Sequence, residues 1–156
     1  MIEKYFQNLY EIDGIEAFVL IDDHNQIIDT WANSKYDASF FREIGKSYLQ
    51  IFGIEEKLNF DADEIVVLFD RGLIFVRNHR KFFLIILANP YVDISYIRLA
   101  VNVSLYELEE SRKSQKLFKK LPIEKPYSFN ESELDEAERL MIEKITENRN
   151  AAGTAK

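Results

Sequence analysis

Few residues of this chain combine the types and spacings that catalysis requires. Cysteine is absent, so thiolate nucleophiles, disulfides and cysteine-ligated zinc are excluded. His24 and His79 fall in expected turns, and neither has a histidine or cysteine partner at metal-ligand spacing. Asp61, Asp63 and Glu64 form an acidic cluster that lacks the glycine and the spaced ligands of a calcium-binding loop. The sequence therefore predicts no metal site and no cofactor.

The triplet Gly-Lys-Ser at 45–47 matches the end of a phosphate-binding loop. That motif needs another glycine five positions before Gly45, where this chain has Phe40, and the segment is expected to be helical. No serine lies in the pattern of a nucleophile elbow. We therefore expect a protein that is not an enzyme.

Charge and hydropathy limit the partners that the chain is expected to bind. The 156 residues include 20 basic and 27 acidic side chains, a net charge of −7. This balance disfavours nucleic acid and anionic membranes, which attract surplus Lys and Arg. The N-terminus lacks the layout of a secretion signal, and the longest apolar run, 82–88, is shorter than the roughly 20 residues that span a bilayer. A cytoplasmic protein is the expectation.

The spacing of apolar residues indicates which elements must position the remaining side chains. Three- and four-residue steps predict helices, and short apolar runs bounded by turn residues predict strands. The predicted helices are 2–12, 37–53, 93–110 with a continuation as far as 121, and 131–149, and the predicted strands are 15–21, 26–31 and three runs between 64 and 90. This order, α-β-β-α-β-β-β-α plus an extra C-terminal helix, predicts an α+β fold. We expect a domain over 1–121, a linker and amphipathic helix over 122–149, and a disordered tail over 150–156.

The run from Ile65 to Phe69 is apolar without alternation, as in a strand covered on both faces. It is nevertheless the first strand of a three-strand meander, a position that easily becomes a sheet edge. An apolar edge favours aggregation, and antiparallel pairing with the same strand of a second copy would remove it. The predicted dimer interface comprises Ile65, Val66, Val67, Leu68, Phe69 and Gly45. The alternative is that 122–149 folds back over this strand.

Gly45 supports a second copy because a helical glycine lets another backbone approach closely, although it costs about 1 kcal/mol relative to alanine. The alternative is that Gly45 packs closely on the molecule's own sheet.

Several stretches of the sequence resemble the Roadblock/LC7 family, including its bacterial MglB-like members. They are DGIEAFVLID and NQIIDTWA for the first two strands, FFLIILANP for the last strand and DISYIRLAVNVSLYEL for the closing helix. The resemblance covers about residues 1–110. The chain departs from the family in lacking a glycine in the first hairpin turn and in having the 122–149 extension.

This resemblance implies a roadblock/profilin-like α/β sandwich, with a five-stranded, mostly antiparallel sheet and helices on both faces. It also implies a homodimer with one sheet across both subunits, which regulates or scaffolds a Ras-like small GTPase. In MglB-like members the dimer promotes GTP hydrolysis by remodelling the GTPase and inserts no catalytic group. The second helix with its dimer mate would be the docking surface, where we single out Phe41, Glu43 and Tyr48 as partner-binding residues.

Two other functions remain open at this point. Sheets flanked by helices in this order can also enclose a small ligand, as PAS-like or profilin-like sensor domains do, and 12 Phe and eight Tyr could line a pocket. A ligand-sized cavity with a few convergent polar groups would favour this function. The chain could also be a structural subunit of a larger signalling assembly, docked through 130–149.

Overall fold

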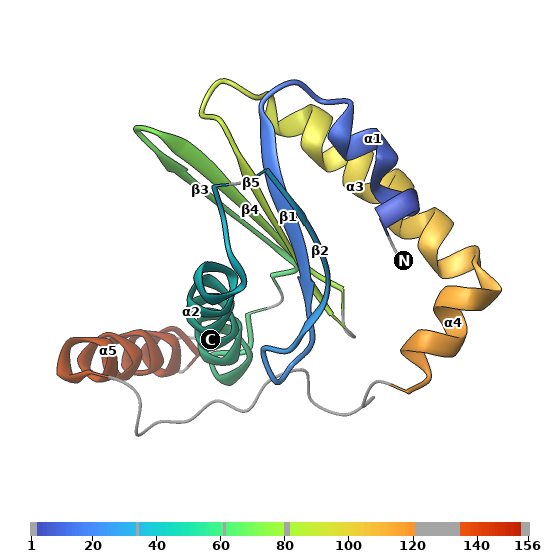
Figure 1. The fold of residues 1–156 in the computed structure, drawn as a ribbon. Coiled ribbons are helices and arrows are strands. Elements are labelled where there is room, and N and C mark those ends of the chain that lie inside the picture. Colours follow the sequence, from blue (N-terminus) through green and yellow to red (C-terminus); the bar gives the residue numbers. More distant parts are fainter. Residues whose placement is uncertain (1–2, 34, 61, 80–81, 121–134, 154–156) are drawn as a thin grey trace.

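The computed structural model describes residues 3–33, 35–60, 62–79, 82–120 and 135–153. It contains a five-stranded, fully antiparallel sheet in the order β2-β1-β5-β4-β3, with helices on both faces (Figure 1). The strands are β1 Ile15–Ile21, β2 Ile27–Ala32, β3 Glu64–Phe69, β4 Gly72–Asn78 and β5 Phe83–Ala88. The helices are the 3-10 turn η1 Glu3–Phe6, α1 Gln7–Tyr10, α2 Ala38–Lys57, α3 Ile94–Glu110, α4 Arg112–Phe118 and α5 Glu136–Gly153. The predicted α+β class and the predicted order of elements are confirmed.

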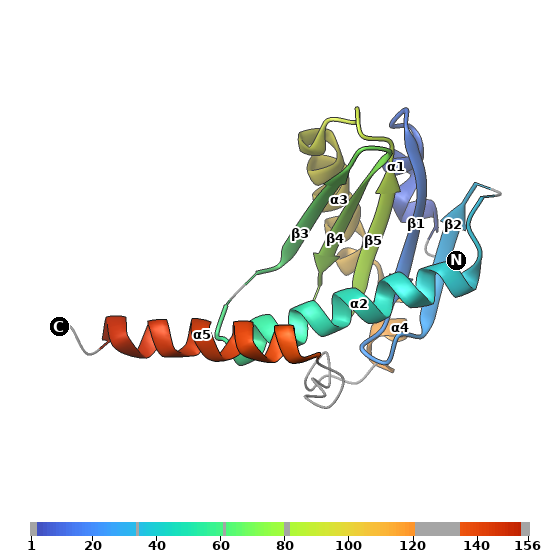
Figure 2. The same cartoon turned by 90° about the vertical axis from the view of Figure 1, so that its left-hand side faces the viewer.

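The two central strands have apolar side chains on both faces because helices cover both sides of the sheet. All six residues of β5 are buried, and so are all residues of β1 except Glu16. One set of their side chains packs under α2, and the alternate set packs under α1 and α3. Figure 2 shows α2 lying across one face of the sheet, with α3 behind it.

Helices α2 and α3 begin just after Asp37 and Asp93, the first residues of the predicted helices 37–53 and 93–110. The Asp37 carboxylate accepts a hydrogen bond from Phe40 N at 2.9 Å, and the Asp93 carboxylate accepts one from Ser95 N at 2.8 Å. Helix α2 continues to Lys57, past the predicted end at Gly53.

Two other helix boundaries of the core differ from the predictions. The predicted continuation of the 93–110 helix to 121 is wrong, because Ser111 takes an extended conformation, with ψ 119°, and separates α3 from α4. The Tyr5 hydroxyl hydrogen-bonds Ser111 at this break. At the N-terminus, the predicted helix 2–12 is a 3-10 turn followed by one α-helical turn that ends at Tyr10.

The extra C-terminal helix is present as α5, and the part of the predicted helix from 131 to 134 lies outside the described residues. Helix α5 starts with a capping box in which Glu138 N donates to Asp135 at 2.8 Å and Asp135 N donates to Glu138 at 2.9 Å. The helix continues to Gly153, so the first residues of the predicted tail are helical. Among the described residues, no helix has the length and apolar composition needed to cross a membrane.

Candidate functional site: an open sheet edge beside helix α2

Strand β3 lies at the edge of the sheet and pairs only with β4 among the described strands. The register places Ile65 opposite Val76 and Val67 opposite Ile74. Two residue pairs before Ile65 and Val76, Asn78 N donates to the Asp63 carbonyl at 2.8 Å. Hydrogen-bonded pairs alternate along an antiparallel ladder, so residues 63, 65 and 67 bond towards β4. The backbone groups of residues 64, 66 and 68 therefore point to the open side.

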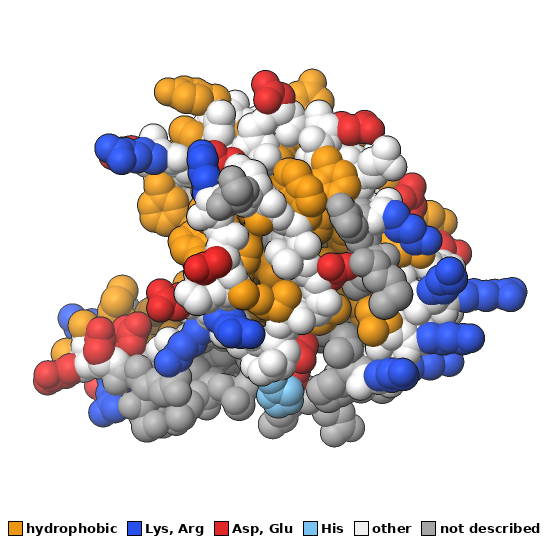
Figure 3. Space-filling view, viewed as in Figure 1, with side chains coloured by type: hydrophobic (Ala, Val, Ile, Leu, Met, Phe, Trp, Pro, Cys, Tyr) orange, Lys and Arg blue, Asp and Glu red, His pale blue; other side chains and the backbone are white. Residues whose placement is uncertain are grey.

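The open end of β3 is also apolar. Leu68 is 63% exposed and Phe69 is 52% exposed, and hydrophobic side chains are visible at this rim of the molecule (Figure 3). The start of the strand is held in the core, because Ile65 and Val67 pack on the side of α2 and Val66 packs on the side of α3. Helix α5 lies beside α2 and leaves the β3 edge uncovered in both ribbon views (Figures 1 and 2).

An ionic cluster fixes the first residue of this strand to two neighbouring elements. The Glu64 carboxylate accepts hydrogen bonds from Arg77 on β4 at 2.7 Å and from Arg98 on α3 at 2.5 Å. The hydrogen bond from Arg98 is the largest cause that holds the pKa of Glu64 below its ordinary value, and the charge of Arg77 adds to it. The cluster orients the edge strand against the rest of the sheet.

The three partner-binding residues predicted on α2 do not share a surface. Phe41 and Tyr48 are only 1% and 7% exposed and pack on the sheet. The prediction that they meet a partner is therefore not supported by their placement, and burial raises the pKa of Tyr48. Glu43 is exposed on the outer side of the helix. Phe40 and Ile51, at 38% and 40% exposed, are the exposed large apolar residues of α2.

Gly45 faces its own chain. A Cβ atom at this position would overlap Asn25 Oδ1 and lie 2.8 Å from Ile21 Cδ1, both in the hairpin formed by β1 and β2. Close packing on the molecule's own sheet, the alternative that the sequence left open, accounts for this glycine. Gly45 therefore provides no argument for a second copy.

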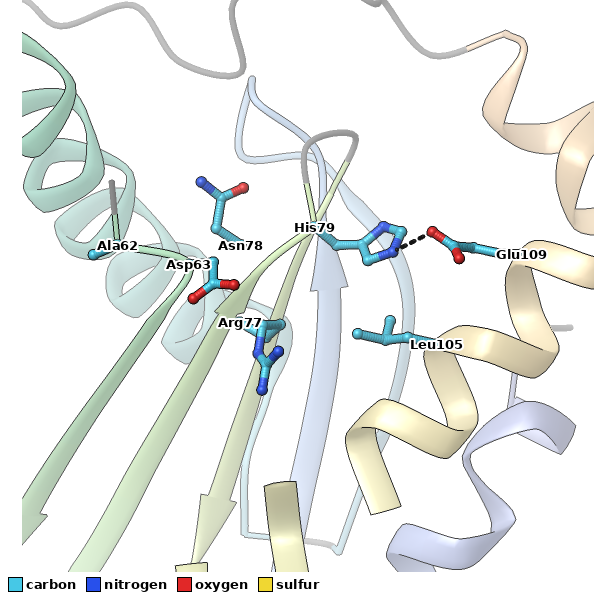
Figure 4. Close-up of a pocket in the computed structure, with 7 residues that line it drawn as sticks. All are labelled: Ala62, Asp63, Arg77, Asn78, His79, Leu105 and Glu109. Atoms are coloured by element: carbon cyan, nitrogen blue, oxygen red, sulfur yellow. Dashed lines mark ion pairs between the residues drawn. The ribbon is translucent and has the colours of Figure 1, made fainter. Parts of the chain in front are cut away.

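A polar pocket of about 450 Å³ lies at the other end of β3, between the sheet and α3. It is lined by Ala62, Asp63, Arg77, Asn78, His79, Leu105 and Glu109 (Figure 4). His79 Nε2 lies 2.9 Å from Glu109 Oε1, and the imidazole stacks on Phe82 with ring centroids 4.7 Å apart. Within the described residues, no group of three or more His, Asp or Glu side chains could hold a metal ion. Asp63, Glu109 and Arg77 give the pocket charges of both signs, and its polar side chains can form hydrogen bonds with a ligand.

Sequence reasoning missed this pocket and the Glu64 cluster. Asp63 and Glu109, which both line the pocket, are 46 positions apart in the chain. No local spacing brings such residues together, because only the crossing of α3 over the sheet does so. The local signals were the acidic residues Asp63 and Glu64 and the concentration of charge at residues 77–81.

The structure thus defines a small α+β domain, with an open antiparallel sheet between helix α2 on one face and helices α1, α3 and α4 on the other. No family model matches the sequence, and no curated protein matches it. Solved structures do match. Myxococcus xanthus MglB superimposes with a TM-score of 0.63 at 13% identity, covering 77% of this chain and 96% of that one.

A Roadblock/LC7 domain from Streptomyces avermitilis gives a TM-score of 0.54 at 16% identity, covering 65% of this chain and 88% of that one. The gliding protein MglB from Thermus thermophilus gives a TM-score of 0.52 at 12% identity, covering 66% of this chain and 82% of that one. The chain therefore has the Roadblock/LC7 fold, as the resemblance in its sequence predicted. Identities at this level establish the fold alone.

Proposed function

We propose that the chain is a non-catalytic homodimeric regulator or adaptor of a Ras-like small GTPase. The observation that most supports this proposal is the open, apolar β3 edge beside α2 in a Roadblock/LC7 fold. The inference that the partner is a small GTPase rests on the resemblance to the Roadblock/LC7 family. Another similar structure is described as MglB with a tetrameric arrangement, at a TM-score of 0.55 and 11% identity. It supports the idea that copies of this fold assemble with one another.

In the proposed dimer, β3 pairs antiparallel with β3 of the second copy about a two-fold axis. The outward backbone groups of residues 64, 66 and 68 then bond to their counterparts, and the two sheets become one. Leu68 and Phe69 become covered by the partner strand. The two α2 helices come to lie on the same face of the joined sheet, because each lies on that face of its own sheet (Figure 2).

The joined α2 helices form the proposed docking surface. Its components in each copy are the exposed carboxylate of Glu43 and the partly exposed apolar side chains of Phe40 and Ile51. An apolar centre with charges at its rim is the usual composition of a transient protein interface. The regulator would act on the GTPase by changing its conformation and would contribute no catalytic group.

The test is a pull-down of the purified chain with Ras-like GTPases from the same organism, each loaded with GDP or with a GTP analogue. We expect binding to at least one GTPase that depends on the nucleotide, and a loss of that binding for Glu43→Arg. Glu11→Arg, the same charge reversal at an exposed residue just after α1 on the opposite face of the sheet, is the control variant. The proposal would be contradicted if no GTPase showed binding that depends on the bound nucleotide. Measuring GTP hydrolysis by the bound GTPase then separates activation from tethering.

The pocket in Figure 4 supports a second candidate function, a sensor of small polar ligands. Its volume of about 450 Å³ lies within the range of ligand sites, and charges of both signs converge on it. The aromatic side chains, in contrast, fill the core, where the ring centroids of Phe6 and Phe18 lie 5.3 Å apart and those of Phe52 and Phe83 lie 5.2 Å apart. A thermal-shift screen with free amino acids and nucleotides, repeated with His79→Ala, would test this candidate. No shift with any compound would exclude these ligand classes.

A further inference from the structure

The outer side of α3 presents an apolar stripe to the solvent. Tyr96, Leu99, Val103 and Tyr106 are 65%, 61%, 40% and 66% exposed. Their three- and four-residue spacing places them along one side of the helix over about 15 Å. The core side of the same helix is formed by other residues, such as Ile97, Val101 and Leu108, which are fully buried. Such a stripe has the geometry of one half of a packed helix pair.

A basic cluster follows the stripe in the chain. It consists of Arg112, Lys113, Lys116, Lys119 and Lys120, all exposed, on and just after α4. Figure 3 shows Lys and Arg side chains gathered on this side of the molecule, over α4. The whole chain has a net charge of −7, so this concentration of positive charge is a local feature. It would attract an acidic partner surface.

Helix α5 has the complementary chemistry. Glu136, Leu140, Glu143 and Glu147 lie along one side of it, at four- and three-residue steps. Leu140 and the adjacent Met141 are 51% and 65% exposed, and no residue of the helix is buried. The capping box stabilises the start of α5 through residues of the helix itself. Protein helices nevertheless owe most of their stability to a packed apolar face, which α5 lacks because none of its residues is buried. Helix α5 therefore has an acidic, partly apolar side available for a partner.

We propose that α5 of one copy docks on the α3–α4 face of a second copy. The acidic side of α5 would lie against the basic cluster, with Leu140 and Met141 against the Tyr106 end of the stripe. Helix α5 does not cover the α3–α4 face of its own chain, because it lies beside α2 on the opposite side of the sheet (Figure 1). This contact is separate from the β3 edge, so it would join the proposed dimers into larger assemblies.

An anionic membrane is a poorer occupant of the same face. Glu107 and Glu110 are exposed between the stripe and the basic cluster, and negatively charged lipid would repel both carboxylates. A protein helix can instead place its own basic residues opposite them.

The test is the binding of a fluorescently labelled synthetic peptide of residues 135–153 to the full chain, followed by anisotropy. We expect saturable binding below about 100 μM, the range of weak specific interfaces. Tyr106→Glu should weaken binding about tenfold or more, because it places a charge within the apolar contact. Lys113→Glu/Lys116→Glu should weaken it by a similar factor, whereas the control Lys35→Glu, on an exposed loop, should not.

A charge-swapped peptide gives the decisive comparison. The peptide with Glu136→Lys/Glu143→Lys should bind the wild-type chain poorly and the Lys113→Glu/Lys116→Glu chain well. Absence of wild-type binding, or no recovery with the swapped pair, would overturn the proposal. Cosedimentation of the full chain with phosphatidylserine vesicles, without binding of the peptide, would assign this face to a membrane and also overturn it. Because the peptide assay does not need the β3 contact, it stays informative if the proposed dimer fails.

Discussion

Replacing Gly45 with alanine would test the packing of α2 on the β1–β2 hairpin. In an ordinary helix interior this change stabilises by about 1 kcal/mol. Here the new methyl would overlap Asn25 Oδ1 and lie 2.8 Å from Ile21 Cδ1. The Asn25 side chain would have to move and lose the hydrogen bond that its amide donates to the Arg42 carbonyl at 2.7 Å. Overpacking of this kind costs about 1–3 kcal/mol. After the gain of about 1 kcal/mol from helix propensity, we expect a net destabilisation of up to about 2 kcal/mol.

The source of that cost can be isolated by a double-mutant cycle with Asn25→Gly. Asn25 has a φ of 58°, a conformation that glycine adopts without strain. Of the three atoms nearest to the new methyl, two belong to the Asn25 side chain and would be removed, and the third is the flexible end of Ile21. In the Asn25→Gly background, Gly45→Ala should therefore change the free energy of unfolding by close to zero.

The assay is urea denaturation of the four proteins at a single protein concentration, followed by circular dichroism. A fixed concentration matters because any self-association contributes to the measured stability. If Gly45→Ala destabilised both backgrounds equally, the Asn25 contact would not be the reason for the glycine, and this account of the helix–hairpin packing would be wrong.

Three further predictions concern the edge strand and two titrating groups. Val66→Pro should convert the dimer to a monomer in light scattering and leave the far-ultraviolet circular dichroism unchanged, because proline removes an outward N–H and spares the hydrogen bonds to β4. A second variant, Leu68→Lys, should weaken the dimer. If both variants remained dimeric, the proposed strand pairing would be contradicted. Glu64→Gln should destabilise the fold by about 2 kcal/mol at neutral pH, because it leaves Arg77 without a carboxylate. Since the folded pKa of Glu64 is lowered, this stabilisation is present above the unfolded pKa near 4.5 and is lost as the pH falls through the folded pKa. If wild type and Glu64→Gln differed in the free energy of unfolding by the same amount in urea melts at pH 7 and at pH 3, this prediction would be contradicted. Burial and the hydrogen bond to Glu16 raise the pKa of Tyr36 to about 12. An absorbance titration should therefore show one tyrosine that ionises near pH 12 and is absent in Tyr36→Phe, and the stabilisation of the fold by Tyr36 should be lost as the pH rises from 10 to 12. A titration curve that Tyr36→Phe leaves unchanged would contradict this prediction.

The sequence predicted the order of elements and the character of the central strands. The continuous apolar runs 17–21 and 82–88 are buried throughout, as expected for strands covered on both faces. Asp37 and Asp93 cap the helices that follow them, because a capping carboxylate acts within a few residues of its own position. Signals of this kind are local, so the sequence displays them directly.

The residues whose roles depend on packing were harder to predict. On α2, Phe41 and Tyr48 proved to be core residues, since the helical spacing alone did not say which side faces the sheet. Likewise, Gly45 contacts a hairpin that lies 20 residues earlier in the chain at Asn25. The end of α3 at Ser111 was missed because residues 109–116 are all polar, so apolar spacing gives no signal at the point where the backbone turns.

The mass of the chain in solution, measured by light scattering at low micromolar concentration, tests the central claim most directly. If β3 pairs with β3 of a second copy, the particle has at least twice the 18.4 kDa of one chain, and Val66→Pro returns it to 18.4 kDa. A wild-type protein that stays at 18.4 kDa would show that the open edge has no partner strand, and the proposed regulator would lose the surface on which it depends.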